Sequence, residues 1–272
     1  YDAPILPDPE PPPETDYLVV ESTYGDRSHP PATAAEALGR EVRAAVARGG
    51  AIVIPSFAIG RTQEVLFLLR QLEQEGRIPV LPVFVDSPMA TDATPVYRAH
   101  REDHDLEMDA LLERGVEPLT PGQLTFTRTI DQSKAINRVH GTCIIISASG
   151  MASGGRVLHH LERRLPEPST TVLLVGFQAV GTRGWSLQSG ATTVRIHGAD
   201  VPVRARIVSL PGFSAHGDRD EVSRWLDGMT RPPRRTFCVH GEPAALAAQS
   251  ERIAARGWQV HVPVHLESVE ID

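Results

Sequence analysis

Short apolar runs alternate with helical patterns along most of the chain, and this alternation constrains its fold more than any other feature. "AIVIPSF" at residues 51–57 and "PVLPVFVDSP" at residues 79–88 read as buried strands, and residues 60–76 between them have helical spacing. Residues 142–177 repeat the pattern, with "TCIIISASG" and "TVLLVGF" as strands and "ASGGRVLHHLERRL" as the helix between them. Strands that alternate with helices predict an α/β fold with a mainly parallel sheet and crossover helices.

The remaining predicted elements lie on either side of this region. Helices are predicted at residues 32–48, 94–115, 218–229 and 243–256, and strands at residues 16–22, 192–198, 201–210, 235–241 and 259–271. The strands at 192–198 and 201–210 are expected to pair antiparallel, after a Gly-rich loop at 176–190. Residues 1–16 are rich in proline and acid, so they should form an extended connector.

Net charge and cysteine content exclude several classes of protein. The net charge of −7 argues against a protein whose whole surface binds nucleic acid, although a local basic groove stays compatible with it. The apolar runs are far shorter than the roughly 18 residues of a membrane helix, and the first residues do not resemble a secretory signal. With Cys143 and Cys238 as the only cysteines, a disulfide framework is not expected. We therefore expect a protein of the reducing cytoplasm that does not bind membranes.

Polar side chains follow several of the predicted strands. The residues in question are Glu21, Arg61, Asp86, Ser87, Ser147, Ser149, Gln178, His216 and His240. Ligands of open α/β sheets bind beyond the carboxyl ends of the strands. If these strands belong to one sheet, the polar groups at their ends describe a cleft. His216 also lies among small residues, in "PGFSAHGDRDE", which leaves its ring room to meet a substrate.

Each of these candidates also has an ordinary structural interpretation. Glu21 can instead cap the turn at Gly25, and His240 can bond a loop carbonyl. The histidines expected at solvated or purely structural positions are His159, His160, His261 and His265. The run "SGMASGGR" lacks the lysine and serine of a Walker motif, and no HxH, HExxH or CxxC occurs. Spacing alone therefore predicts no complete metal site.

Eight ordered motifs, taken together, resemble one family. They are "DYLVVESTYGDRSH", "IPSFAIGRTQEVLFLL", "VFVDSPMA", "SKAIN", "IIISASGMASGGRVLHHL", "VGFQAVGTRG", "GFSAHGDRDE" and "CVHGEP". This order is similar to that of the β-CASP metallo-β-lactamase-fold nucleases, which include RNase J and prokaryotic RNA-processing hydrolases. The resemblance implies a β-CASP cap at residues 27–207, between metallo-β-lactamase segments at residues 1–26 and 208–272. These segments would form the C-terminal half of an αββα core.

The resemblance also implies roles for the three acidic and histidine motifs. Glu21 matches the acidic motif A, His216 matches motif B and His240 matches motif C. His216 would be the general acid that protonates the leaving oxygen, Glu21 would hold its tautomer, and His240 would bind one of two zinc ions. The residues implied as substrate contacts are Arg61, Lys134, Ser149, Gly150 and Arg156.

One departure from the family pattern limits this expectation. Family members carry HxHxDH and further metal ligands before motif A, and this sequence begins after the position that they would occupy. We therefore expect these residues to be the C-terminal part of a zinc-dependent ribonuclease that is inactive without the rest. The alternatives are a non-catalytic RNA-binding scaffold and a nuclease that acts on DNA. RNA is the expected partner, with single-stranded DNA and a homodimer as further candidates.

Overall fold

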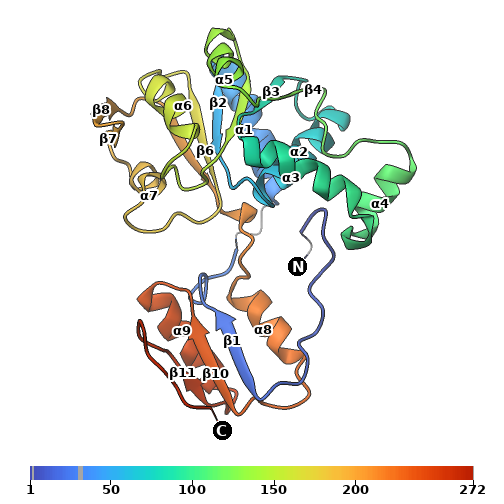
Figure 1. Cartoon of the computed structure of the whole chain (residues 1–272), viewed down its shortest axis with the longest axis vertical. Coiled ribbons are helices and arrows are strands. Elements are labelled where there is room, and N and C mark those ends of the chain that lie inside the picture. Colours follow the sequence, from blue (N-terminus) through green and yellow to red (C-terminus); the bar gives the residue numbers. More distant parts are fainter. Residues whose placement is uncertain (2, 30–32, 272) are drawn as a thin grey trace. The chain divides into compact units, whose positions relative to one another are not determined.

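The computed structural model of the chain describes residues 1, 3–29 and 33–271, and these residues fall into two units (Figure 1). The larger unit comprises Ala3–Pro7 and Pro30–Ala215, and the smaller one comprises Tyr1–Asp2, Asp8–His29 and His216–Asp272. The boundaries expected from the sequence, after residues 26 and 207, stay a prediction about domains.

A six-stranded sheet forms the centre of the larger unit. Its strands, in spatial order, are β4 (Gln123–Phe126), β3 (Pro82–Val85), β5 (Ile144–Ser147), β2 (Ile52–Pro55), β6 (Thr171–Val175) and β9 (Arg206–Leu210). Every neighbouring pair in this sheet is parallel. The predicted mainly parallel α/β sheet is therefore confirmed.

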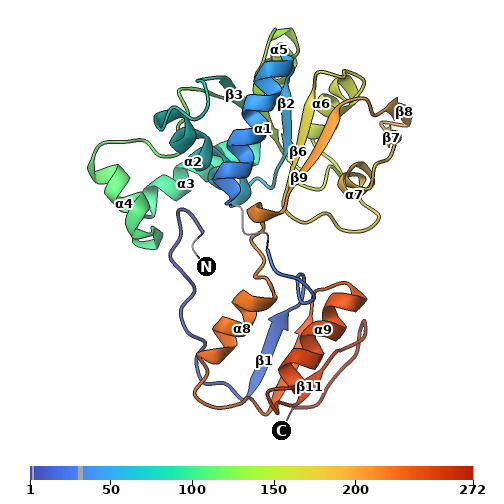
Figure 2. The same cartoon turned by 180° about the vertical axis from the view of Figure 1, so that it is seen from behind.

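Helices cover both faces of this sheet, because the central strands are apolar on both faces. The helices of the larger unit are α1 (Ala34–Arg48), α2 (Arg61–Gln74), α3 (Pro88–Ala99), α4 (Leu106–Glu113), α5 (Ile130–Ala135), α6 (Val157–Arg164) and α7 (Arg183–Gln188). Helix α1 lies in front of the sheet in Figure 2. Helices α1 and α2 pack with Ile52 and Ile54 in one apolar cluster, and α6 packs with Val53 in a second one. Burial on both faces explains why these strands read as continuous apolar runs rather than alternating ones.

Helix α1 shows how local sequence sets the ends of an element. Thr33 caps its N-terminus by accepting from the backbone N–H of Glu36, and the Glu36 side chain accepts from the Thr33 backbone in return. Gly49 ends the helix in the left-handed conformation, with φ of 68°. Residue 32, where the sequence predicted the helix to start, lies outside the described residues.

The predicted single helix at residues 94–115 is wrong, because the segment is broken into three pieces. Helix α3 begins earlier, where Ser87 accepts from the Ala90 N–H and Pro88 occupies the first helical position. It ends before His100, and a short 3-10 turn follows at Arg101–Asp103. Asp105 then caps α4 by accepting from the Met108 N–H. The two N-terminal caps, Ser87 and Asp105, start two separate helices. The pattern of apolar residues alone does not show this division.

The region after β6 also differs from the prediction. The expected Gly-rich loop at 176–190 contains α7, which Thr182 caps. An antiparallel hairpin does form, from β7 (Thr193–Ile196) and β8 (Ala199–Pro202). The expected second strand at 201–210 is split, however, and its latter half, β9, pairs parallel with β6. The strand β4 and the helix α5 had no counterpart among the predicted elements.

The smaller unit is built on a parallel three-stranded sheet. Its strands, in spatial order, are β1 (Tyr17–Glu21), β10 (Arg235–Val239) and β11 (Val260–His261), and its helices are α8 (Arg219–Asp227) and α9 (Pro243–Ala254). Leu18, Val20, Leu226, Cys238 and Ile253 form its core. The closing strand is far shorter than the predicted 259–271, and His265 lies outside it, exposed.

The polar strand ends, which the sequence placed around one cleft if all strands shared a sheet, are divided between two sheets. Glu21 and His240 lie at or after the ends of strands of the small sheet, whereas Asp86, Ser147 and Gln178 lie at or after the ends of strands of the large sheet. The strands do not share one sheet, so the polar residues form two separate groups, one in each unit. Among the described residues, no helix combines the length and the apolar character needed to span a membrane.

Candidate active site

The small sheet brings Glu21 and His240 together at its carboxyl edge. Strands β1 and β10 are parallel neighbours, and Glu21 lies in register with Val239, directly before His240. The backbone N–H of Ser22 donates to the His240 carbonyl over 3.3 Å. Gly241 permits this approach, because a Cβ there would lie 2.6 Å from the Ser22 carbonyl oxygen. Parallel pairing thus places two residues more than 200 positions apart on adjacent loops.

His216 joins this pair from the loop before α8. Its Nδ1 lies 2.5 Å from Glu21 Oε2, and the Gly217 N–H donates to the other oxygen, Oε1, over 3.2 Å. Because the ionised carboxylate only accepts, Nδ1 of His216 is the donor in this contact. The other ring nitrogen, Nε2, is then the one that can exchange a proton with a substrate.

The Thr23 hydroxyl ties the three side chains together. It donates to Glu21 Oε2 over 2.7 Å and lies 3.0 Å from His240 Nδ1 and 3.3 Å from His216 Nδ1. A hydroxyl has a single hydrogen, so once Thr23 donates to Glu21 it can only accept a hydrogen bond from His240. His240 Nδ1 is then the donor to Thr23, and Nε2 is its basic nitrogen. Sequence reasoning missed Thr23, although it lies two residues after Glu21 in "ESTYG".

Opposing effects act on the Glu21 carboxyl group. Burial raises its pKa, but hydrogen bonds from His216, Thr23 and the Gly217 N–H outweigh burial, and the pKa lies below its ordinary value. Glu21 is therefore ionised at neutral pH. The side chains of Glu21, His216 and His240 are 32%, 36% and 66% exposed, so the cluster is open to a ligand from solvent.

The helix after His216 is anchored independently of Glu21. Asp218 accepts from the Glu221 N–H in a capping box and from the His29 N–H over 2.6 Å. The His29 ring contacts the His216 carbonyl through Nε2, at 3.1 Å. This second set of contacts positions the backbone that carries His216. The capping box joins two residues three positions apart, Asp218 and Glu221, at the start of α8.

The donor atoms of this cluster suit a zinc ion. Glu21, His216 and His240 each offer a ligand atom, and these atoms lie within 4.8 Å of one another. Imidazole nitrogen and carboxylate oxygen are zinc donors, and three protein ligands are the usual number at a catalytic zinc. His240 is the most exposed of the three, and its Nε2 is directed by the contact of Nδ1 with Thr23. Glu21 and His216 instead bind each other.

The predicted substrate contacts all lie in the larger unit, and their role stays a prediction. Arg61 is buried at 6% exposure, paired with Glu64 and stacked over the Phe213 ring. Lys134 is exposed on α5. Ser149 Oγ accepts from the Ser153 N–H, and Gly150 lies so close to Phe57 that a Cβ would meet that ring at 2.9 Å.

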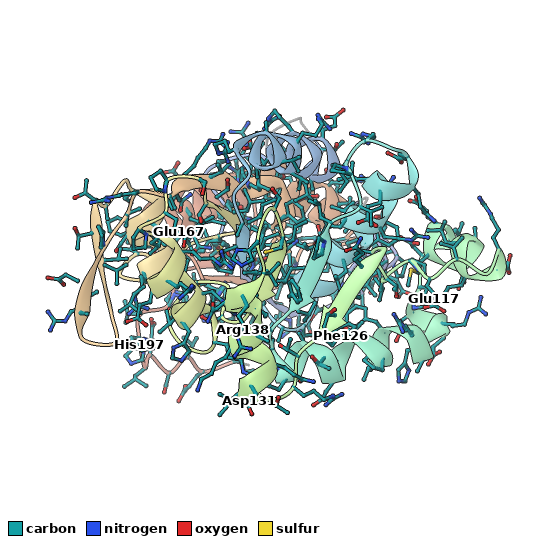
Figure 3. All side chains as sticks on the ribbon, turned by 90° about the horizontal axis from the view of Figure 1, so that it is seen from above. Glu117, Phe126, Asp131, Arg138, Glu167 and His197 are labelled. Atoms are coloured by element: carbon teal, nitrogen blue, oxygen red, sulfur yellow. The ribbon has the colours of Figure 1, made fainter. Side chains whose placement is uncertain are left out.

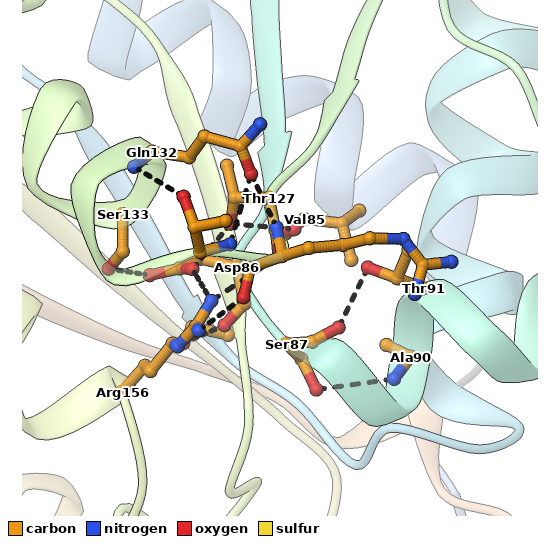
Figure 4. Close-up of polar contacts among 12 residues, drawn as sticks. Val85, Asp86, Ser87, Ala90, Thr91, Thr127, Gln132, Ser133 and Arg156 are labelled. Carbon is orange, nitrogen blue, oxygen red and sulfur yellow. Dashed lines mark hydrogen bonds and ion pairs between the residues drawn. The ribbon is translucent and has the colours of Figure 1, made fainter.

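Arg156 belongs to a buried network centred on Asp86, which follows β3 (Figure 4). Asp86 is fully buried and accepts from Thr127, Ser133, Arg156 and His160 over 2.5, 2.6, 2.8 and 2.7 Å. Burial raises the pKa of Asp86, but these donors outweigh it and hold the pKa far below its ordinary value. The network joins the loops after β3, β4 and β5.

The prediction of a solvated position for His160 is wrong. The side chain is 2% exposed, and its Nε2 contacts Asp86. The neighbouring His159 does lie on the exposed face of α6. Adjacent helix residues differ by about 100° in direction, so one histidine turns inward and the other outward. The sequence could not distinguish them because Asp86 lies more than 70 residues away.

Two domain families match the chain. Residues 62–187 match the Beta-Casp domain, and residues 200–263 match the Zn-dependent metallo-hydrolase RNA specificity domain. The two matches cover the centre of the larger unit and most of the C-terminal part of the smaller one.

Several curated proteins are similar to the chain over most of its length. Ribonuclease TTHA0252 of Thermus thermophilus is 36% identical over 269 residues, which cover 98% of the chain and 61% of that protein. An RNase J-like protein of Methanocaldococcus jannaschii is 32% identical, over 84% of the chain and 52% of that protein. The transcription termination factor FttA of Methanosarcina mazei is 30% identical, over 86% of the chain and 38% of that protein. The chain thus spans 38 to 61% of the length of these relatives.

Proposed function

The chain belongs to the β-CASP family of metallo-β-lactamase-fold nucleases, and from this premise we propose that it serves a zinc-dependent ribonuclease. Its part would be to supply the general acid and one metal ligand for hydrolysis of RNA phosphodiesters. The ribonuclease name of one relative and the RNA specificity domain support RNA as the substrate. The description of that domain as zinc-dependent supports the metal.

The observation that carries this proposal is the contact of 2.5 Å between Glu21 and His216, beside His240. Glu21 fixes the proton of His216 on Nδ1 and stabilises the ring when Nε2 also carries a proton. Nε2 then donates that proton to the oxygen that leaves from phosphorus. Thr23 and Gly217 hold the Glu21 carboxylate in place, so the acid keeps its orientation through the reaction.

His240 would hold the metal through Nε2, with Thr23 fixing its ring. When bound, zinc would neutralise charge on the phosphate and activate water. Only three candidate ligands gather in this cluster among the described residues, and Glu21 and His216 already bind each other. Two ions need about three protein ligands each. We propose, therefore, that residues 1–272 do not cleave RNA on their own.

The two histidines can be tested separately in the whole gene product. His216→Ala should abolish cleavage of a labelled RNA while zinc content, measured after dialysis, stays nearly unchanged. His240→Ala should lower both cleavage and zinc content. His265→Ala, at an exposed histidine of the same unit, is the matched control and should change neither. Equal zinc loss in the His216 and His240 variants would contradict the separate roles.

The same assay separates the alternatives. Equal cleavage of RNA and single-stranded DNA oligonucleotides would make the protein a general nuclease, and RNA binding without cleavage by the whole gene product would make it a scaffold. A homodimer, which is part of the proposal, would double the mass in analytical ultracentrifugation. A cytoplasmic location, also proposed, would be tested by cell fractionation.

A further inference from the structure

A second group of metal-binding side chains lies on the larger unit, on α6 and the β7–β8 hairpin. His159 and Glu162 are three residues apart on α6 and so share one face of the helix. His197 occupies the turn of the hairpin, between β7 and β8 (Figure 3). One ligand atom from each of the three lies within 4.8 Å of the others. His197 Nδ1 is 3.0 Å from Glu162 Oε2, and the two imidazole rings are 4.5 Å apart.

The packing of the hairpin on α6 holds these groups in place. Val194 and Ile196 on the hairpin belong to the same apolar cluster as Val157 and Leu161 on the helix. These residues are at most 5% exposed, so a buried apolar interface fixes the hairpin on the helix. The side chain of His197 is therefore already held near the helix before an ion binds. Binding of an ion then costs little conformational entropy, because no loop has to become ordered.

The chemistry of the group selects a particular class of ion. Two imidazoles and one carboxylate are donors for Zn²⁺ and similar transition metals, whereas Mg²⁺ and Ca²⁺ prefer sites made of oxygen. The side chains of Glu162 and His197 are 41% and 38% exposed, so an ion can reach them and water can complete its coordination. Within the described part of the chain, the ring nitrogens of His159 make no hydrogen bond.

The alternative is an ordinary ion pair between His197 and Glu162. Such a pair explains why His197 and Glu162 lie together. It does not explain why the ring of His159 lies against the ring of His197. Two other groups of possible ligands are weaker candidates. His29, Asp218 and Glu221 are used in capping α8 and anchoring its loop. The group around His100 combines one imidazole with exposed carboxylates on a 3-10 turn.

We propose that His159, Glu162 and His197 form a binding site for one Zn²⁺ ion that links α6 to the β7–β8 hairpin. The site is independent of the ribonuclease proposal, since it uses none of the residues of the Glu21 cluster. Its expected role is structural. The inner face of the same helix contributes His160 to the Asp86 network, so the ion would fasten the hairpin to a helix that is already fixed on its other side.

Zinc titration by isothermal calorimetry, followed by metal analysis after dialysis, tests the site. The variants are His159→Gln, Glu162→Gln and His197→Gln, and His140→Gln, an exposed histidine of the same unit, is the matched control. Each of the three variants should bind about 100-fold more weakly at this site, or lose one zinc ion per chain, whereas the control should match the wild type. Glu162→Gln keeps the size and the hydrogen bonding of the side chain. Loss of zinc in this variant would therefore come from the lost carboxylate ligand and not from altered packing.

The Glu21 cluster is itself a proposed zinc site, so the comparison is repeated in a His240→Ala background. The loss caused by His197→Gln should persist there unchanged. Zinc should also slow amide hydrogen exchange at the hairpin turn in the wild type but not in the variants, and Mg²⁺ should have no effect. Unchanged zinc stoichiometry and affinity in His159→Gln and His197→Gln would overturn the proposal, as would equal protection by Mg²⁺.

Discussion

Replacement of Asp86 by asparagine gives a sharp test of the reasoning about the larger unit. Asp86 is fully buried and accepts from four side chains, one of them the Arg156 guanidinium. The substituted amide would keep one acceptor oxygen and present an NH₂ group to donors that need an acceptor. Removal of one partner from a buried ion pair costs about 3–5 kcal/mol, because the remaining charge is left uncompensated. Arg156 is 21% exposed, so the lower end of this range applies.

A matched control lies on the surface of the same unit. Asp92 pairs with Arg128 over 2.7 Å, but both side chains are more than 60% exposed. Exposed pairs contribute about 0–1 kcal/mol, so Asp92→Asn should change the free energy of unfolding little. Urea unfolding followed by circular dichroism gives both values. If the two variants lost the same stability, within about 1 kcal/mol, the argument from burial would fail.

The pH dependence gives an independent check on Asp86. Its pKa in the folded protein is depressed, so the folded state holds its proton less tightly than the unfolded state does. The stabilisation is complete above the unfolded pKa of about 3.9 and is lost as pH falls further, by up to about 1.4 kcal/mol per pH unit. The stability difference between wild type and Asp86→Asn should therefore shrink below pH of about 4. A difference that stayed constant to pH of about 3 would refute the assigned ionisation.

Three further predictions concern other contacts. Thr23→Val removes the hydroxyl that orients His240 and Glu21, so RNA cleavage by the whole gene product should fall about 10- to 100-fold, and Thr23→Ser should restore it. Gly50→Ala should destabilise the chain by about 1–3 kcal/mol in urea unfolding, because its Cβ would lie 1.9 Å from the Ser169 carbonyl oxygen. Gly154→Ala is its control, because among the described residues no atom beyond the neighbouring residues would lie within 4 Å of the added Cβ. Removal of metal with EDTA should abolish RNA cleavage by the whole gene product and leave its far-ultraviolet circular dichroism unchanged, and added zinc should restore the activity.

Much of the fold could be predicted because the strongest signals are local. The strands β2, β5 and β6 are apolar at nearly every position, and helices such as α2 separate them with regular spacing. Elements without such a signal were missed. The strand β4 alternates exposed and half-buried residues at the edge of its sheet, and α5 has only six residues. The sequence pattern of each is therefore hard to distinguish from that of a loop.

The candidate site was predicted by motifs rather than by geometry. Glu21, His216 and His240 were singled out because they follow apolar runs and match family motifs, but no sequence pattern pointed to Thr23. A single hydroxyl has no pattern in the sequence. It gains its role only when β1 and β10 pair in parallel and bring the loops after them together.

The sequence by itself determined the strongly apolar strands and the helices between them, because apolar periodicity acts over a few positions. Tertiary structure alone decided which strands share a sheet, and therefore which polar strand ends meet. It also decided that His160 faces Asp86 while His159 faces the hairpin. The reason is physical: a buried charge is stable only beside donors brought from distant segments, and such partners exist only after the chain has folded.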